Sequence, residues 1–287
     1  MTQYLSILYG GFLRAATDRM RIANAFHRHA EDYDQYASVQ KRVMRELDRM
    51  LASQLASNPT KVLDIGCGTG AMLAALSRRY PESSLFGLDL AFNMAQRSLH
   101  RFAGKAQTVN ADAEQLPFKD QTFELVVSAS TFQWIKSLDF CFKECQRVLK
   151  AGGVLCAAFF GDRTLWELQE CYRQAVSNRF GVDDIRHGRQ HRFRTRIEVQ
   201  DLLAGLGYEQ VQVTTKTEIE YHQDVPELLR SIKGIGAATT ARNDAVGGLG
   251  WRKMLAEMAD IYRSGFLIDD KIPATYEVLY VVARRSS

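Results

Sequence analysis

The chain has 287 residues, of which 46% are hydrophobic and 24% are charged, and its formal net charge is +4. These values are ordinary for a soluble globular protein and predict one core domain with elaborations. The longest apolar runs, such as residues 154–160, are far too short to span a bilayer, which excludes a membrane-spanning protein. The mild positive charge permits an acidic partner but does not demand one.

The cysteine pattern bears on the compartment. None of the five cysteines belongs to a CxxC pair or has a spacing to histidine that suits zinc, so we expect no metal site. An odd number of cysteines without a disulfide framework indicates a reducing compartment. The first 19 residues have no basic residue before their apolar patch and no clear cleavage site, so we expect no secretory signal. We therefore expect a cytoplasmic protein.

Residues 1–57 are predicted to form a tail followed by helices. Apolar residues recur at helical spacing in two runs, the first from Met20 to Phe26 and the second from Val43 to Leu55, with a helix end at Asn58-Pro59. Tyr33 and Tyr36 lie between the runs. They could pack a helix pair or belong to a lid over a ligand, and the sequence leaves both interpretations open.

Strands and helices then alternate at short intervals up to residue 160. The predicted strands are residues 62–65, 84–89, 106–110, 123–128 and 154–160, and the predicted helices are residues 72–80, 92–102 and 137–149, the last stopping at Lys150 to Gly153. This alternation predicts a parallel sheet with helices on both faces and ligands outside the carboxyl ends of its strands. Three acids, Asp64, Asp89 and Asp112, fall at that edge.

Beyond residue 160 the alternation loosens, with helical insertions at about residues 163–206 and 222–270. The first holds a predicted helix over residues 166–176 and another that starts at Thr195, where Glu198 completes a capping box.

Two further strands are predicted over residues 208–220 and 276–283. Residues 224–264 between them are predicted to be helical, with a glycine-rich break at Gly247, Gly248 and Gly250. Because no linker separates these elements, we assign residues 58–283 to one domain.

The strongest motif runs from Lys61 to Gly70 and reads KVLDIGCGTG. A buried strand leads into three glycines, which permit a close approach of the backbone to a ligand, and helix N–H groups follow. The pattern is typical of a nucleotide-binding turn. A P-loop would end in Gly-Lys-Ser or Gly-Lys-Thr, whereas Gly70 is followed by Ala-Met, so that class is excluded.

Asp64 separates the two remaining classes. A dinucleotide-binding turn fits Gly66-x-Gly68-x-x-Ala71, with Asp89 at the distance expected of a ribose-binding acid. However, the Asp64 carboxylate would then face a pyrophosphate of like charge. S-adenosylmethionine has an ammonium and a sulfonium and no phosphate, so the same carboxylate favours its binding, and Asp89 suits the ribose diol. The residues therefore favour S-adenosylmethionine as the cofactor.

With these residues identified, the core resembles the class I S-adenosylmethionine-dependent methyltransferases. The blocks VLDIGCGTG, GLDL, NADAEQLPF, FELVVSASTFQW and RVLKAGGVL lie between residues 62 and 155 in the order of that family. The resemblance implies a Rossmann-like α/β fold with a seven-stranded, mostly parallel sheet, an antiparallel last strand and helices on both faces. It also implies the cofactor-binding residues, which are Asp64, Gly66, Cys67, Gly68 and Gly70 in the turn, Asp89 and Leu90 after the second strand, Asp112 and Ala113 beside the adenine, and Ser128 by the reactive methyl.

The segments on both sides of this core carry a narrower resemblance. AFHRHAEDYDQYASVQ and LLRSIKGIGA are similar to the malonyl-[acyl-carrier protein] O-methyltransferases of biotin synthesis, which extends the resemblance from about Ile22 to about Ala283. It implies that the chain methylates the free carboxylate of a malonyl thioester, on acyl carrier protein or on CoA, at the start of pimeloyl synthesis.

Such a reaction needs no general base, because a carboxylate is already an anion at neutral pH. A cation or a tyrosine must hold the carboxylate oxygen that does not react. The candidates are Tyr33, Arg230 and Lys233, ahead of Gln133 and Trp134. Arg230 and Lys233 are three residues apart and could instead form a solvated helix face, the commoner role of such pairs.

Arginines crowd one segment of the first insertion and suggest an anionic partner. They are Arg186, Arg189, Arg192, Arg194 and Arg196. Acyl carrier protein is acidic as a class, so the cluster is expected to dock it. It would also suit the phosphates of an RNA substrate, although no RNA-binding appendage is recognisable. Methylation of a quinone precursor or of a free carboxylic acid is a further alternative. We expect neither a nucleic acid nor a membrane as the partner.

Overall fold

The computed structural model describes residues 22–27, 33–55, 57–102, 105–180, 193–235 and 249–287. The chain divides into two compact units. The helical unit comprises residues 1–36, 163–192 and 217–276, and the sheet unit comprises residues 37–162, 193–216 and 277–287. The sequence predicts two parts that follow one another along the chain, residues 1–57 and 58–283. Each observed unit instead combines several separate segments, so the units do not test this division, and it stays a prediction.

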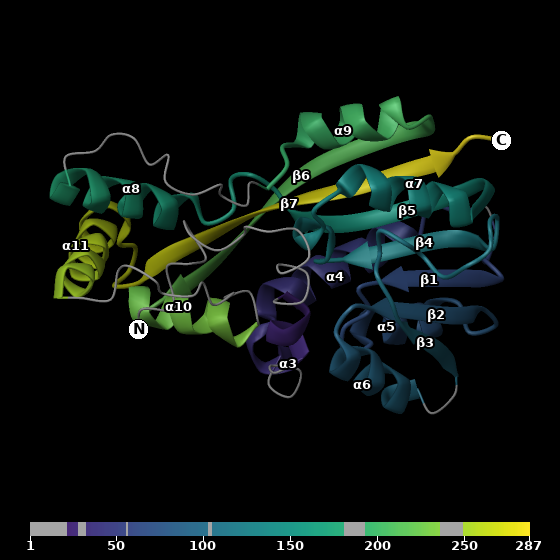
Figure 1. Ribbon diagram of the computed structural model, residues 1–287, viewed down its shortest axis with the longest axis horizontal. Coiled ribbons are helices and arrows are strands. Elements are labelled where there is room, and N and C mark those ends of the chain that lie inside the picture. Colours follow the sequence, from purple (N-terminus) through teal and green to yellow (C-terminus); the bar gives the residue numbers. More distant parts are fainter. Residues whose placement is uncertain (1–21, 28–32, 56, 103–104, 181–192, 236–248) are drawn as a thin grey trace. The chain divides into compact units, whose positions relative to one another are not determined.

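Seven strands form one sheet in the order β3-β2-β1-β4-β5-β7-β6 (Figure 1). The first five strands of this order pair in parallel, and β7 pairs antiparallel with β5. The strands are β1 (Lys61–Ile65), β2 (Ser84–Asp89), β3 (Ala106–Asn110), β4 (Phe123–Ala129), β5 (Leu149–Phe160), β6 (Tyr208–His222) and β7 (Ile272–Arg285). The predicted seven-stranded, mostly parallel sheet is confirmed.

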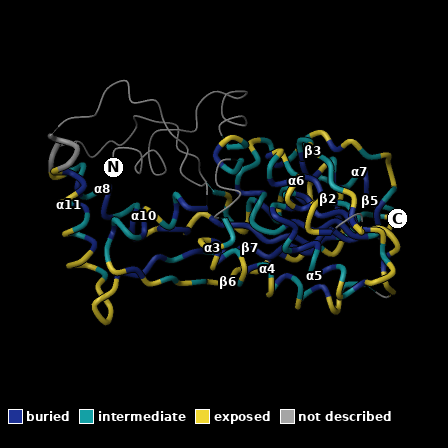
Figure 2. Tube along the Cα trace, turned by 90° about the horizontal axis from the view of Figure 1, so that it is seen from below, coloured by how far each residue is buried: buried dark blue, intermediate teal, exposed yellow. Residues whose placement is uncertain are grey.

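Helices cover both faces of the sheet, so β1, β4 and β5 are buried over most of their length (Figure 2). One face packs against α7 (Leu138–Val148) and α9 (Arg196–Gly205). The other face packs against α4 (Ser38–Leu51) and α5 (Ala71–Arg79). The sheet unit also contains α6 (Phe92–Phe102) and a short 3₁₀ helix, η1 (Phe132–Trp134). No helix among the described residues is long and apolar enough to cross a membrane.

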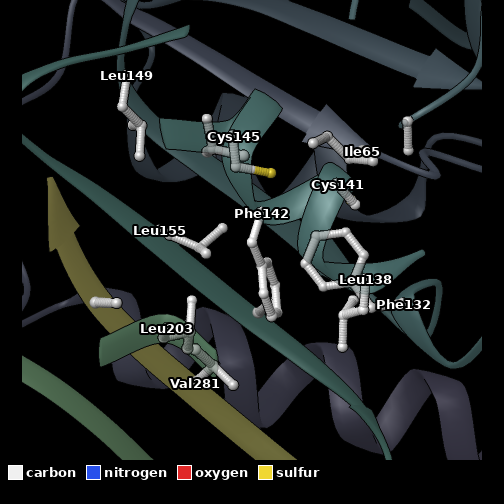
Figure 3. Close-up of a cluster of buried hydrophobic side chains, with 14 of the residues drawn as sticks. Ile65, Phe132, Leu138, Cys141, Phe142, Cys145, Leu149, Leu155, Leu203 and Val281 are labelled. Carbon is white, nitrogen blue, oxygen red and sulfur yellow. The ribbon is translucent and has the colours of Figure 1, made fainter. Parts of the chain in front are cut away.

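Large apolar side chains fill the space between the sheet and α7 (Figure 3). The ring of Phe142 is fully buried and meets the ring of Phe132 edge-on, with 5.4 Å between the ring centroids. The ring centroid of Phe159 in β5 lies 5.8 Å from the ring centroid of Phe132. Leu203 of α9 and Val281 of β7 belong to the same cluster. The cluster also includes residues of β1, β2, β4 and β6, so it joins α7 and α9 to six strands of the sheet.

Two hydrogen bonds hold α9 and the start of β6 against α7. Gln146 Nε2 donates to the carbonyl of Leu206 at 2.9 Å, and the Tyr208 hydroxyl donates to the carbonyl of Phe142 at 2.8 Å. The predicted capping box at Thr195 is confirmed, because the Thr195 hydroxyl accepts from the N–H of Glu198 and the Glu198 carboxylate accepts from the N–H of Thr195.

Several predicted boundaries were wrong. The helix predicted to reach Asn58 ends at Leu51, where the N–H groups of the next three residues bond to carbonyls three positions back and the helix tightens into a turn. Lys150 to Gly153 belong to β5, whose register with β4 shifts here to accommodate them. Gly250 does not break a helix, because it lies in the first turn of α11 (Leu249–Phe266), and Gly247 and Gly248 lie outside the described residues.

The helical unit contains α3 (Tyr33–Tyr36), α8 (Trp166–Phe180), α10 (Val225–Gly234) and α11, and residues 22–27 are also helical. α8 packs against α11 through the edge-on rings of Trp166 and Phe266, whose centroids are 5.3 Å apart. α10 packs closely against α3, since a Cβ on Gly234 would lie 2.4 Å from the ring of Tyr36. The absent side chain at Gly234 therefore allows the contact between α3 and α10.

Replacing Phe142 by alanine should lower the free energy of unfolding by about 3–5 kcal/mol, because the substitution leaves a cavity among packed rings. Phe140 lies two residues earlier on the same helix but is 56% exposed. The matched variant Phe140→Ala should cost less than about 1 kcal/mol, mainly the contact of its ring with Lys143. Urea unfolding of both variants measures the difference, and similar losses would contradict the described core.

Candidate functional site

The glycine turn between β1 and α5 is held to the end of β2 by backbone hydrogen bonds. The N–H groups of Gly66 and Cys67 both donate to the carbonyl of Leu88, at 2.7 and 2.9 Å. Gly66, Gly68 and Gly70 have φ angles of 72°, 52° and 84°. Glycine adopts such positive angles without steric cost, so all three glycines suit the conformation of the turn.

Asp89, at the end of β2, fixes the same turn with its side chain. One carboxylate oxygen accepts from the N–H of Gly68 at 2.9 Å, and the other accepts from the N–H of Ala91 at 2.8 Å. Asn110, at the end of β3, donates to the carbonyls of Asp89 and Leu90. Asn110 was not predicted from the sequence, although its place at the carboxyl end of a strand is the signal that identified the three acids.

The three glycines differ in what surrounds them. A Cβ on Gly66 would lie 2.0 Å from Thr131 Oγ1, and a Cβ on Gly70 would lie 2.8 Å from Ser98 Oγ. Gly66 and Gly70 are therefore needed for packing within the protein. A Cβ on Gly68 would meet no heavy atom within 4 Å. Gly68 is thus the glycine of the turn that borders open space in which a ligand could lie against the backbone.

Asp64 is the unusual residue of the site. It lies on β1 between Gly87 of β2 and Val127 of β4, and it is only 1% exposed. Among the described residues neither oxygen of its carboxyl group has a hydrogen-bond partner. A buried polar group without a partner is costly, and a buried charge is more so. The Asp64 carboxyl group is therefore suited to bind a cation or a strong hydrogen-bond donor.

The charges at the site reinforce this conclusion. Burial, and to a smaller extent the nearby Asp89 carboxylate, raise the pKa of Asp64 to about 8. Burial also raises the pKa of Asp89 to about 6, although the N–H groups of Ala91 and Gly68 act to lower it. Burial makes both acids costly to ionise, and the Asp89 carboxylate adds to that cost at Asp64, so the pair favours a positively charged ligand. Burial likewise keeps the pKa of the Cys67 thiol high, so Cys67 is neutral and packs as a small apolar side chain.

The other predicted cofactor-binding residues lie at the carboxyl edge of the sheet. Leu90 is 39% exposed just after β2. Asp112 follows β3, and its side chain accepts from the N–H of Glu114 at 2.9 Å, while Ala113 is buried. Ser128 is buried in β4, and its hydroxyl donates to the carbonyl of Ile65 at 2.9 Å. In this structure Ser128 therefore joins β4 to β1, and its predicted place by the reactive methyl stays a prediction.

The predicted substrate-binding residues Tyr33, Arg230 and Lys233 belong to the helical unit. Tyr33 lies on α3, and Arg230 and Lys233 lie on α10, which packs against α3. Arg230 is exposed and Lys233 is partly exposed. The structure thus brings the helices of all three residues together.

Of the lower-ranked candidates, Gln133 donates to the carbonyl of Ser130 within the segment after β4, and Trp134 ends η1. Among the predicted docking arginines, Arg194 and Arg196 are exposed, and the other three lie outside the described residues. They are Arg186, Arg189 and Arg192.

Sequence comparisons identify relatives over nearly the whole chain. A family model described as a methyltransferase domain matches residues 63–157. The malonyl-[acyl-carrier protein] O-methyltransferase of Geobacter sulfurreducens is 44% identical over 93% of this chain and 99% of that protein. The protein of the same name from Methylovorus sp. is 37% identical over 92% of this chain and 88% of its own length. The biotin biosynthesis bifunctional protein BioHC of Teredinibacter turnerae is 31% identical, and this chain spans 50% of it.

Solved structures show the same fold at low sequence identity. The YcgJ protein of Bacillus subtilis has a TM-score of 0.58 and 17% identity, with 85% of this chain and 99% of that chain covered. Phosphoethanolamine N-methyltransferase 2 of Haemonchus contortus, in complex with S-adenosyl-L-methionine, has a TM-score of 0.53 and 16% identity, with 90% of this chain and 57% of that chain covered.

The sheet order, the glycine turn and the acids at the strand ends define a class I S-adenosylmethionine-dependent methyltransferase. Because the similarity continues through both flanks of the sheet, the chain belongs to the family of malonyl-[acyl-carrier protein] O-methyltransferases.

If Asp64 binds the cationic part of S-adenosylmethionine, the variant Asp64→Asn should bind the cofactor at least about tenfold more weakly, because the variant has no carboxylate to offer the cation. The affinity of the wild-type protein should rise with pH up to about 8, as Asp64 gives up its proton. Isothermal calorimetry at several pH values measures both effects. An unchanged affinity in the variant, or no pH dependence in the wild type, would contradict the role of Asp64.

Stability tests the same carboxyl group without a ligand. Because the pKa of Asp64 is raised in the folded state, its contribution to stability is present below about pH 4 and is lost as the pH rises through about 8. Relative to the wild type, Asp64→Asn should gain at least about 2 °C in melting temperature between pH 6 and pH 9. If the melting temperatures of the two proteins changed with pH in the same way, the result would contradict a buried Asp64 with a raised pKa.

Substitutions at two glycines of the turn should have different effects. In Gly68→Ala the new methyl group meets no protein atom, so the variant should lose only about 1–2 kcal/mol for its positive φ but bind the cofactor much more weakly. In Gly66→Ala the methyl group meets Thr131, so stability should fall further. Thermal unfolding and cofactor titration separate the two outcomes. Equal loss of stability in both variants would refute the open space at Gly68.

Proposed function

We propose that this protein transfers a methyl group from S-adenosylmethionine to the free carboxylate of malonyl-acyl carrier protein, forming the methyl ester at the start of pimeloyl and biotin synthesis. The observation that carries the proposal is the buried Asp64 carboxyl group beside the glycine turn, which has no hydrogen-bond partner within the described part of the chain and suits a cationic methyl donor. The names of relatives that match more than nine-tenths of the chain support malonyl-acyl carrier protein as the substrate.

The residues of the turn and of the strand ends would hold the cofactor. Asp64 would face its positive charge, and the backbone at Gly68 would lie against its methionine end. Asp89 remains partly exposed and would accept hydrogen bonds from the ribose hydroxyls. Leu90 and Asp112, with Ala113, would flank the adenine. When bound, the cofactor supplies an electrophilic methyl group on a cationic sulfur.

The substrate carboxylate is the nucleophile, so the protein has to position it rather than remove a proton from it. One carboxylate oxygen forms the new bond to carbon while the bond between carbon and sulfur breaks. Orientation of the reacting atoms can lower a barrier by about 7–11 kcal/mol. The protein also has to keep the second oxygen in place without neutralising the first. A cation or a hydroxyl on a packed helix suits that role.

We assign that role to Tyr33, Arg230 and Lys233. α10 buries one face, including Leu228, Leu229 and Ile232, and presents Arg230 on its exposed face. Because the buried face fixes the orientation of α10, Arg230 has a defined direction rather than belonging to a wholly solvated helix.

The five cysteines are all free and buried, which supports activity in a reducing cytoplasm. In this proposal residues 58–283 form the methyltransferase domain and residues 1–57 form a tail and a helical lid.

The test is methyl transfer from labelled S-adenosylmethionine, with malonyl-carrier protein, malonyl-CoA, acetyl-carrier protein, a free carboxylic acid and bulk RNA as acceptors. Label should appear as a base-labile ester on a malonyl thioester, most efficiently on the carrier protein. Arg230→Ala should lower kcat/KM for malonyl-carrier protein by about 10- to 100-fold, the value of a hydrogen bond to a charged group. Cofactor affinity should not change.

Arg263→Ala provides the matched control, because Arg263 is an exposed arginine on α11 in the same unit. It should retain full activity. Label on RNA, or none on any malonyl thioester despite cofactor binding, would refute the proposed substrate. Equal activity of the Arg230 and Arg263 variants would refute only the assignment of Arg230.

A further inference from the structure

Two large apolar side chains project from the outer surface of the sheet unit. Phe140 is 56% exposed in the first turn of α7, and Ile197 is 61% exposed in the first turn of α9. Both helices bury their opposite sides against the sheet. The two side chains therefore lie on faces that are directed away from the sheet.

The first turns of these helices lie at the same edge of the sheet. α7 leads directly into β5, which is parallel to β4, so α7 starts at the carboxyl edge and ends at the amino edge. The hydrogen bond from Gln146, near the end of α7, to Leu206, just after α9, places the end of α9 at the amino edge too. Figure 1 shows β5 and β6 starting at the ends of α7 and α9, so the two helices run in the same direction.

Four basic side chains accompany the apolar pair. Lys136 precedes α7, Arg194 and Arg196 lie at the start of α9, and the ammonium of Lys143 lies 5.5 Å from the ring centroid of Phe140. All four are exposed, and none forms an ion pair with any other described residue. We call Lys136, Phe140, Lys143, Arg194, Arg196 and Ile197 the α7/α9 surface.

Carboxylates on the same helices do not cancel this charge. Glu198 is engaged in the capping box with Thr195, and Glu144 is paired with Arg147. Asp139 and Asp201 also lie on these helices, and the Glu198 carboxylate keeps its charge in the capping box, so the balance on this part of the two helices is four cations to three anions. The α7/α9 surface is therefore apolar and basic.

The position of this surface relates it to the cofactor-binding turn. Lys136 comes seven residues after Ala129, the last residue of β4, and β4 pairs in parallel with β1, which leads into the glycine turn. The α7/α9 surface and the turn thus belong to the same edge of the sheet, within one compact unit. A partner bound here would hold a flexible thioester arm near the edge where the methyl donor is expected.

We propose that the α7/α9 surface docks the acidic acyl carrier protein that delivers the malonyl thioester. This inference rests on the proposed function and adds the place where the carrier protein binds. Apolar side chains beside exposed cations suit a folded, acidic protein partner, whose interface combines an apolar centre with complementary charge. RNA is less suited, because Lys143 covers one face of the Phe140 ring and Ile197 cannot stack on a base.

The test uses the full chain with Lys143→Glu and Arg196→Glu combined, and a second variant with Phe140→Ser and Ile197→Ser combined. The binding probe is fluorescently labelled holo-acyl carrier protein without malonate. Each double variant should weaken its binding about tenfold. The KM for malonyl-carrier protein should rise by a similar factor, while the KM for malonyl-pantetheine and the affinity for S-adenosylmethionine stay unchanged. Added salt should weaken binding to the wild type more than to the charge variant.

The matched control reverses two exposed charges at the amino edge, Lys105→Glu with Lys119→Glu. It should bind the carrier protein as the wild type does. Thermal unfolding checks that every variant is folded. The proposal would be overturned if both double variants were folded and bound the carrier protein as tightly as the wild type does. It would also be overturned if their KM for malonyl-pantetheine rose as much as their KM for malonyl-carrier protein. A third outcome would overturn it too: the wild type binds a single-stranded RNA more tightly than the carrier protein, and both double variants lose this RNA binding.

The two proposals fail in different ways. A wild-type protein that binds the carrier protein through this surface but methylates no malonyl thioester would refute the reaction and retain the docking site. A wild-type protein that methylates malonyl-pantetheine but binds the carrier protein equally well in all variants would retain the reaction and refute the docking site.

Discussion

The proposed cofactor site depends on a buried carboxyl group that has no hydrogen-bond partner among the residues that the structure describes. Asp64 lies in the middle of the sheet, between β2 and β4, and the hydrogen bonds of those strands fix its backbone. The turn that follows cannot move toward it, because Gly66 and Cys67 are bonded to Leu88. The free-energy cost of burying the Asp64 carboxyl group is therefore present in the ligand-free protein, and it becomes smaller when a cation binds. Such preorganisation favours affinity for a charged ligand over stability of the empty site.

Much of the sheet unit could be predicted from the sequence, because its signals are local. The first four strands and the capping box at Thr195 were predicted to within a residue or two, since each rests on apolar periodicity or on residue types at fixed spacing. Asp64 could be singled out by charge alone. Its lack of partners could not, because that depends on every group that packs around it.

The misses arise where distant parts of the chain meet. Thr131 closes over Gly66 from 65 residues away, and Ser128 bonds to Ile65 across a strand pair. Nothing in the local sequence of Thr131 or Ser128 identifies these contacts. Lys150 to Gly153 have the composition of a helix end, but Leu149 before them and Val154 after them both pair with β4, and this long-range pairing includes the segment in β5.

The two units carry different parts of the proposed function. The general methyltransferase model matches residues 63–157, which all lie in the sheet unit. Tyr33, Arg230 and Lys233 lie outside that match, in the helical unit, and it is the family-specific relatives that extend over them. This distribution is what we expect if the sheet supplies chemistry common to the class and the helical segments select the acceptor.

The place of β7 in the sheet has a consequence for biosynthesis. β7 begins at Ile272 but lies between β5 and β6, so β6 can join the sheet only after β7 has been made. A nascent chain that stops before Ile272 leaves the edge of β5, one of the most apolar strands, without its neighbour. Exposed apolar edges pair readily with other chains. Co-translational folding of this protein should therefore finish late, and chaperone contact should be concentrated on the segment from β5 to β6.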